Sequence, residues 1–207
     1  VLQKTLGAVR SRPRPALTDP SQVGQLLLAI RGHTGTLTVK CALMLAPYTF
    51  VRPGELRRMR WEDLELDGPY PHWVIPASRT KMRRDHVVPL ARQCVEIIET
   101  MRVVSSRSEW VFPCRNLDSP QPMSENAVNK ALQKLGYDTQ EQMCGHGFRA
   151  LARSMLSELK TTHGWPDEAI ERQMSHVERN KVKRVYDRAA YLGQRRAMMQ
   201  VWADHLD

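Results

Sequence analysis

Apolar residues recur at three- and four-residue intervals over most of the chain, which predicts a mainly helical protein. The first predicted helix begins near Thr18, a good N-cap residue, and ends at Gly32. A second apolar helix is predicted at about 36–47, and a shorter one at 53–60 has proline at its first position. Further helices are predicted over 91–103, 124–135, 147–160, 166–175 and 190–206.

The middle of the chain has the pattern of β-strands instead. Runs rich in β-branched residues at 72–78 and 86–90 flank the polar segment 79–85, which predicts a small hairpin with a strongly basic tip. The apolar tripeptide 110–112 is a candidate for a further strand before the proline-rich loop 113–122. The fold class expected from these patterns is mainly α with a small antiparallel β-sheet.

The start of the chain lacks apolar periodicity. Its first twenty residues hold three prolines and four basic residues, a composition typical of a linker. We therefore interpret residues 1–17 as a linker and residues 18–207 as one domain that ends with the helix 190–206. The first residues read like the interior of a longer protein, and we expect a further segment upstream.

The composition is strongly basic. The 207 residues include 31 Lys and Arg against 22 Asp and Glu, a net charge of +9, and 42% are hydrophobic. That apolar content excludes a disordered tail, and the charge is typical of a nucleic-acid-binding protein, although a basic solvated surface would give the same value. No apolar stretch reaches the roughly 20 residues of a membrane span, and no signal peptide is present, so we expect a cytoplasmic protein without a membrane partner.

Several common chemistries lack support in the sequence. The four cysteines, at positions 41, 94, 114 and 144, form no C-x-x-C pair, so we expect reduced thiols and no metal site. A glycine-rich phosphate loop, an H-E-x-x-H helix and a G-x-S-x-G turn are all missing. Nucleotide hydrolysis, zinc proteolysis and α/β-hydrolase chemistry are therefore disfavoured.

Four basic segments remain as candidates for chemistry. They are TFVRPGELRR around Arg52, SRTKMRRDH around Lys81, CGHGFRALAR around His146 and Arg149, and MSHVERNKVKRVY at 174–186. Guanidinium groups donate several hydrogen bonds and stay charged, which suits the non-bridging oxygens of a phosphodiester. A tyrosine among positive charges is favoured as the phenolate nucleophile, and a hairpin lysine could protonate the leaving oxygen.

These segments, in this order, resemble the catalytic domain of tyrosine recombinases, above all prophage and genomic-island integrases. The matching motifs are FVRPGE, the TK of the hairpin, H-x-x-R, S-H, NKV-x-x-x-Y-x-x-A-x-Y-L and R-x-MMQ-x-WADxLD, and they extend over about 18–207. The resemblance implies the tyrosine recombinase catalytic-domain fold. It also implies a site-specific DNA recombinase that integrates or excises a mobile element such as a prophage, without metal, cofactor or ATP.

The resemblance implies a role for each matched residue. Arg52 and Arg149 would bind the scissile phosphate, and Lys81 would protonate the 5′ oxygen. His146 would hydrogen-bond the phosphate or help to accept the tyrosine proton, and His176 would donate to a non-bridging oxygen. Tyr186 would attack to form a 3′-phosphotyrosyl bond. Glu55, in the same turn as Arg52, would orient a guanidinium. The basic residues expected to contact DNA are Arg79, Arg83, Arg84, His86, Arg179, Lys181, Lys183 and Arg184.

Each residue taken alone also has an ordinary structural interpretation. Arg52 could pair with Glu55 or Asp63, Lys81 could be a solvated hairpin tip, and the basic residues at 179–188 could form a solvated helix face. Arg149 has apolar and small neighbours, and an unpaired buried arginine is costly, which favours anion binding. It is the joint order of the motifs that favours catalysis.

Two positions depart from the pattern of the resembled family. Met174-Ser175-His176 stands where Leu-Gly-His is common, so a glycine-only backbone conformation would be lost there. Tyr191 is a second candidate nucleophile, but its distance from His176 favours Tyr186, and we expect Tyr191 to pack at the start of the last helix.

The resemblance also implies partners and leaves alternatives. The partner would be double-stranded DNA at attachment sites, bound by a homotetramer during recombination, although the isolated domain could be a monomer. The upstream segment would be a core-DNA-binding domain, and the protein would act at the nucleoid of a bacterial cell. The alternatives are a type IB topoisomerase-like enzyme and a DNA-binding regulator that has lost catalysis.

Overall fold

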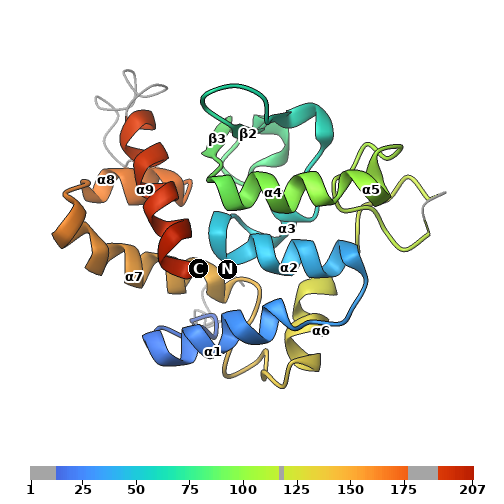
Figure 1. Ribbon diagram of the computed structural model, residues 1–207, viewed down its shortest axis with the longest axis horizontal. Helices are drawn as coiled ribbons and strands as arrows, with labels where there is room; N and C mark the ends of the chain where they lie inside the picture. Colours follow the sequence, from blue (N-terminus) through green and yellow to red (C-terminus); the bar gives the residue numbers. More distant parts are fainter. Residues whose placement is uncertain (1–12, 117–118, 177–190) are drawn as a thin grey trace, which may run out of the picture.

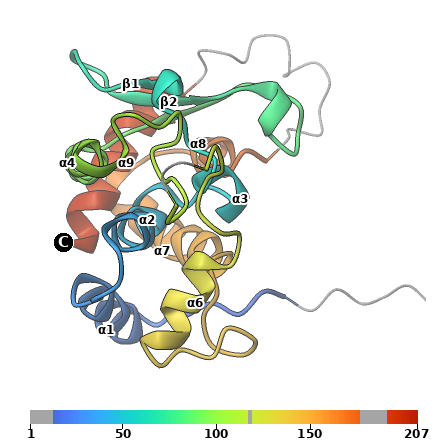
Figure 2. The same ribbon diagram turned by 90° about the vertical axis from the view of Figure 1, so that its right-hand side faces the viewer.

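The computed structural model describes residues 13–116, 119–176 and 191–207 (Figure 1). Within these residues, a small sheet lies at one edge of the domain, and the helices lie below it in Figure 2 (Figures 1 and 2). The helices are α1 (Pro20–Arg31), α2 (Leu37–Thr49), α3 (Pro53–Leu56), α4 (Arg92–Thr100), α5 (Arg102–Ser105), α6 (Ala127–Lys134), α7 (Gly147–His163), α8 (Asp167–Gln173) and α9 (Leu192–Leu206). The strands are β1 (Leu64–Glu65), β2 (His72–Ile75) and β3 (His86–Pro89), with single 3₁₀ turns at Trp61–Asp63 and Ala77–Arg79.

The helix starts differ from two of the sequence predictions. Asp19, and not Thr18, caps α1, and its side chain accepts a hydrogen bond from the Gln22 backbone N–H at 3.0 Å. Helix α6 begins at Ala127, with Asn126 in the cap position, three residues after the predicted cap Ser124. In both cases several cap-forming residues lie close together, and periodicity alone does not choose among them.

The predicted hairpin is confirmed, and a third strand extends it. The sheet has the order β1-β2-β3, with both pairs antiparallel, and Trp73 lies opposite Val88. Trp73, Ile75 and Val88 are buried, as the alternation of side chains across a strand requires. The predicted strand at 110–112 is reduced to an isolated bridge between Trp110 and Arg60.

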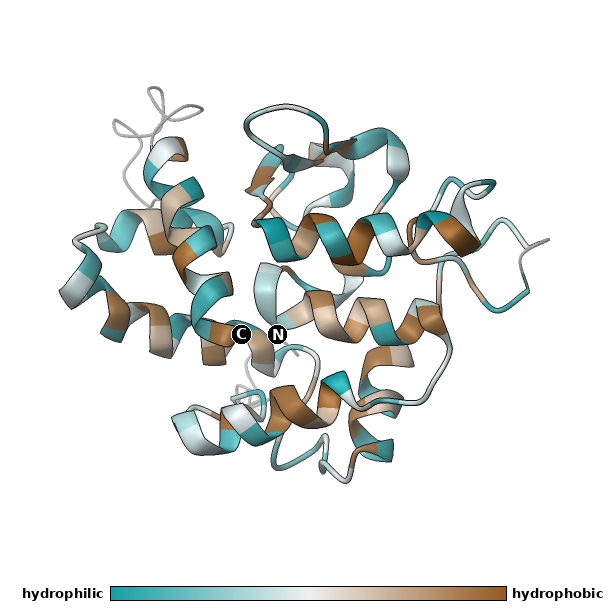
Figure 3. Ribbon diagram, in the orientation of Figure 1, coloured by the Kyte–Doolittle hydropathy of each residue, from teal (hydrophilic) through white to brown (hydrophobic). Residues whose placement is uncertain are grey.

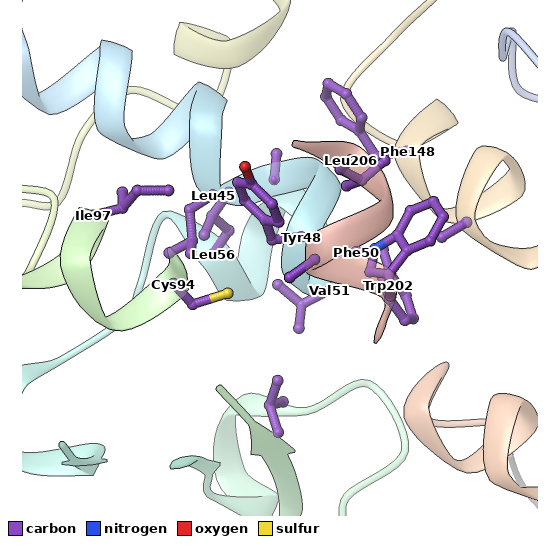
Figure 4. Packing of buried hydrophobic residues seen from close by; sticks show 14 of the residues in the cluster. Leu45, Tyr48, Phe50, Val51, Leu56, Cys94, Ile97, Phe148, Trp202 and Leu206 are labelled. Carbon is purple, nitrogen blue, oxygen red and sulfur yellow. The ribbon is translucent and has the colours of Figure 1, made fainter. Parts of the chain in front are cut away.

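Helix α2 lies at the centre of the domain and contacts α1, α4, α6, α7 and α9. Most of its residues from Cys41 to Thr49 are buried, whereas hydrophobic and hydrophilic residues alternate along the more exposed α4 and α7 (Figure 3). Trp202 of α9 inserts beside Phe50, which follows α2 (Figure 4). Its ring meets the Phe50 ring edge-on at 6.2 Å, and its Nε1–H donates to the Pro47 carbonyl at 3.0 Å. Helix α9 is thus part of the core of its own domain.

The end of α9 is held by a group of hydrogen bonds around Asp207. The Asp207 carboxylate accepts from the Tyr48 hydroxyl at 2.7 Å, from Gln93 Nε2 at 2.9 Å and from Arg31 Nη2 at 2.9 Å. Burial and the hydrogen bond to Asp207 raise the pKa of Tyr48 to about 12. These bonds join α9 to α1, α2 and α4, so the last helix is fixed at both its apolar face and its end.

Candidate functional site

Arg52 is held at the start of α3 by the carboxylate of Glu55. One oxygen of Glu55 accepts from the Arg52 backbone N–H at 3.0 Å, and the other accepts from Arg52 Nη1 at 2.9 Å. Glu55 is only 6% exposed, and hydrogen bonds in such a buried site of low dielectric are stronger than hydrogen bonds in water. Within the part of the chain that the structure describes, the other N–H groups of this guanidinium make no hydrogen bond and are available to a ligand, while Glu55 orients the group.

Arg149 lies in the first turn of α7 and is held by backbone carbonyl groups. Its Nη1 donates to the Phe50 carbonyl at 2.9 Å and its Nη2 to the Met174 carbonyl at 2.6 Å. Among the described residues, no carboxylate forms an ion pair with it. Burial, and then the nearby positive charge of Arg52, lower the pKa of Arg149 to about 10. Glu55 and Glu171 offset part of this effect from a distance, and an anion bound at the guanidinium would stabilise the partly buried charge further.

His146 and residues 15–16 border the same site. Burial, followed by the charges of Arg14, Arg149 and Arg52, lowers the pKa of His146. Residues 15–16 reach this position because position 147 is glycine, where a Cβ would lie 2.4 Å from the Pro15 carbonyl oxygen. A lowered pKa favours the neutral form of His146, the form that can accept a proton.

His176 lies just beyond α8 on the other side of Arg149. Its Nε2 is 3.4 Å from Arg149 Nη2, and its Nδ1 is 2.6 Å from Glu171 Oε2. Arg52, His146, Arg149 and His176, predicted from three motifs far apart in the sequence, therefore converge on one place in the fold. Three elements supply them, namely the start of α3, the start of α7 and the end of α8.

The backbone conformation of Ser175 shows why a residue other than glycine can precede His176. Its φ of +52° lies in the left-handed helical region, which non-glycine residues can enter at a cost of about 1–2 kcal/mol. The turn directs the Met174 carbonyl to Arg149 and the His176 backbone N–H to the Glu171 carbonyl at 2.9 Å. The glycine-only conformation considered from the sequence is thus not needed.

Substitutions at Ser175 test this turn. We expect Ser175→Gly to raise the free energy of unfolding by about 0.5–1 kcal/mol, because relief of the left-handed strain outweighs the added chain entropy. We expect Ser175→Val to lower it by about 1–3 kcal/mol, because a β-branched residue fits that region poorly. Urea unfolding measures both changes, and equal stability of the two variants would contradict the prediction.

Lys81 lies in the exposed loop between β2 and β3. The loop is held from within, since Thr80 Oγ1 donates to the Arg84 carbonyl at 2.8 Å and Asp85 accepts from the Ala77 backbone N–H at 2.9 Å. Within the described residues, Lys81 makes no hydrogen bond or ion pair, and the structure does not bring it into contact with Arg149. The loop lies on the same side of the domain as α3 and α8 (Figure 2).

The comparison with protein families decides the classification. A model described as "Phage integrase family" matches residues 17–192, most of the chain. The chain belongs to the phage integrase family. Among curated relatives, the integrase of Enterobacteria phage P4 is 40% identical over 215 residues, covering 98% of this chain and 47% of that protein. Prophage integrase IntA of Escherichia coli K12 is 38% identical, covering 89% of this chain and 43% of that protein. The chain spans about half the length of these relatives.

Solved structures confirm the expected fold for this family member. The integrase from mycobacterium phage Brujita superposes with a TM-score of 0.66 at 18% identity, over 96% of this chain and 59% of that one. A lambda integrase dimer bound to a COC′ core site gives 0.58 at 16% identity, over 89% and 51%. The XerH recombinase in its post-cleavage complex with difH gives 0.58 at 15% identity, over 92% and 56%. The fold is that of tyrosine recombinase catalytic domains.

His86 does not lie where the DNA-contact prediction for this integrase-family chain placed it. It begins β3 with its side chain on the inner face of the sheet and is only 7% exposed. Burial, and then the charges of Arg195, Arg149 and Arg52, lower the pKa of His86 to about 3. His86 is therefore a neutral buried side chain behind the cationic site and not a surface contact.

The predicted DNA-contacting arginines of the hairpin differ in accessibility. Arg79 forms an ion pair with Asp63 and donates to the Arg58 carbonyl at 3.3 Å, so its guanidinium is held against the domain. This pairing also removes Asp63 as a partner for Arg52. Arg83 and Arg84 are exposed and agree with a position on a contact surface.

Arg195 is a buried residue that the sequence analysis missed. It is 6% exposed, and its guanidinium donates to Gln173 Oε1 and to the Val87 carbonyl, which joins α9 to α8 and β3. Burial, followed by the charge of Arg172, lowers its pKa to about 10. Its place four residues before the apolar Met199 was the available signal, since that spacing puts it on the buried face.

Most of the other predicted site residues lie outside the part of the chain that the structure describes. Tyr186, Arg179, Lys181, Lys183 and Arg184 lie outside the described residues. Tyr191 precedes α9 and packs, half-buried, against the core, in agreement with its predicted structural role.

Among the described residues, no three His, Cys, Asp or Glu side chains are grouped to hold a metal ion, and no described helix is long and apolar enough to cross a membrane.

Proposed function

We propose that this chain is the catalytic domain of a site-specific DNA recombinase that integrates or excises a mobile element. One observation carries the proposal. The guanidinium of Arg149 is partly buried, is held by two backbone carbonyls with no ion pair to a carboxylate of the described residues, and lies beside Arg52, His146 and His176. Such a cluster has the charge and donor geometry to bind a scissile phosphate.

The residues provide the parts of a strand transfer. Arg52 and Arg149 bind the non-bridging oxygens and stabilise the charge that develops on them. Tyr186 attacks phosphorus, so that a 3′-phosphotyrosyl bond forms while the bond to the 5′ oxygen breaks. Lys81 gives its proton to that oxygen, and His146 hydrogen-bonds the phosphate or helps to accept the proton of the tyrosine.

The covalent step conserves the number of phosphoester bonds. A 5′ hydroxyl of a second strand therefore reverses it, and neither ATP nor another energy source is required. The guanidiniums of Arg52 and Arg149 supply the positive charge that stabilises the transition state, so the proposed step uses no metal ion.

The proposed partner is double-stranded DNA at an attachment site. Arg83 and Arg84 on the exposed loop, with the basic residues at 179–184, would contact the phosphates, so binding should weaken steeply with salt. A structural neighbour is a lambda integrase tetramer bound to a Holliday junction, which supports a tetramer on DNA for this family member. Residues 18–207 would form the catalytic domain and residues 1–17 the linker to a core-DNA-binding domain.

Covalent trapping tests the proposal. The protein encoded by the complete gene is incubated in EDTA with a nicked attachment-site duplex, and the products are separated on a denaturing gel. We expect a protein–DNA band that Tyr186→Phe abolishes. Tyr191→Phe is the matched control and should retain the band, because Tyr191 packs against the core. Tight DNA binding without a covalent band would instead favour a regulator that has lost catalysis.

A further inference from the structure

His176 is held by a carboxylate that the predicted catalytic set does not include. Glu171 lies in α8, and its Oε2 is 2.6 Å from His176 Nδ1. The backbone supports this contact, because the His176 N–H donates to the Glu171 carbonyl at 2.9 Å, which turns the chain back on itself. Both side chains keep substantial solvent access, at 50% and 37%.

The partners of the two ring nitrogens determine how His176 can act. A carboxylate only accepts hydrogen bonds, so the contact with Glu171 places a proton on Nδ1. The other nitrogen, Nε2, lies 3.4 Å from Arg149 Nη2, a group that only donates. The neutral ring therefore presents a lone pair at Nε2, and only the imidazolium can donate from Nε2 to a phosphate oxygen.

Opposite charges lie on the two sides of the ring. The carboxylate of Glu171 on α8 lies at Nδ1, and the guanidinium of Arg149 on α7 lies at Nε2, with Arg52 near Arg149. Arg153, one turn beyond Arg149 on α7, binds the second oxygen of Glu171 at 2.8 Å and fixes the carboxylate plane. A bound phosphate would offset the charge of both arginines near the ring.

We propose that Glu171 is a positioning residue for His176, holding the proton on Nδ1 and Nε2 toward the phosphate site, with Arg153 fixing Glu171 in turn. The inference rests on the proposed function for its catalytic consequence. The tautomer of the ring, however, is a property of the DNA-free protein and can be tested without cleavage.

Cleavage kinetics test the catalytic part. Single-turnover cleavage of the nicked duplex is measured for the wild type, Glu171→Gln and Glu171→Asp. An amide can donate as well as accept a hydrogen bond, so it no longer fixes the ring of His176, and we expect Glu171→Gln to be about 10-fold slower. Glu171→Asp keeps the charge and should recover part of the rate. Glu168→Gln, on the same helix, is the control and should match the wild type.

A double variant separates positioning from a general effect on folding. In a His176→Ala background, Glu171→Gln should slow cleavage no further, because the carboxylate acts through the ring. An additional tenfold loss in that background, or cleavage by Glu171→Gln at the wild-type rate, would overturn the inference while wild-type cleavage still upheld the proposed function.

Nitrogen NMR of His176 tests the geometry directly. In the DNA-free wild type we expect the neutral ring to carry its proton on Nδ1. In Glu171→Gln we expect a mixture of tautomers, because the amide can donate as well as accept a hydrogen bond. A wild-type ring protonated on Nε2, or an unchanged ring in Glu171→Gln, would overturn the inference even if the enzyme cleaved no DNA.

Discussion

Replacing Arg149 with lysine is expected to slow DNA cleavage by about 10²–10³-fold, the usual cost of losing one preorganised donor to a charged transition state. The guanidinium spans the carbonyls of Phe50 and Met174 at 2.9 and 2.6 Å and still has N–H groups for a phosphate. An ammonium donates from a single atom and cannot span all three partners.

A lysine at position 149 should also lose its proton, and with it its positive charge, more readily than the arginine. Burial and Arg52 lower the pKa of Arg149 to about 10. Because the ordinary pKa of lysine is about 10.4, well below that of arginine, the same surroundings should deprotonate a lysine at lower pH. We therefore expect the residual activity of Arg149→Lys to decline further as the pH rises.

The measurement is the single-turnover rate of covalent complex formation on a nicked duplex, with circular dichroism to verify folding. Arg92→Lys is the control, since that side chain is 70% exposed on α4, and it should cleave at the wild-type rate. Cleavage by Arg149→Lys within threefold of the wild type would refute the assigned role of Arg149.

Trp202→Ala is expected to lower the free energy of unfolding by about 3–5 kcal/mol. Trp202 is fully buried, contacts the Phe50 ring edge-on and donates to the Pro47 carbonyl, so its removal leaves a cavity and an unpaired acceptor. Because the Phe50 carbonyl binds Arg149, relaxation into the cavity should also displace the guanidinium and slow cleavage.

Urea unfolding measures the stability of this variant. Gln194→Ala is the matched control on the exposed side of α9 and should change stability by less than about 0.5 kcal/mol. A loss below about 1 kcal/mol in Trp202→Ala would show that α9 contributes little to the core of its own domain.

The local pattern of the sequence was sufficient for most elements and for part of the site. Helix periodicity, proline at helix starts and the basic hairpin each depend on neighbours within a few residues. The order of the motifs around Arg52, Arg149 and His176 along the chain predicted a common site, and the structure brings these residues together. The partners that hold Arg149 were not accessible from the sequence, because backbone carbonyls are present at every residue.

The sequence by itself determined the mainly helical class, the β2–β3 hairpin, and the candidate set that converges around Arg149. Only the tertiary structure decided that His86 is buried and that Glu171 rather than solvent binds His176. It also decided that Arg195 joins α9 to α8 and β3. The physical reason is that burial and hydrogen-bond partners depend on contacts between segments far apart in sequence, whereas secondary structure follows from spacing along the chain.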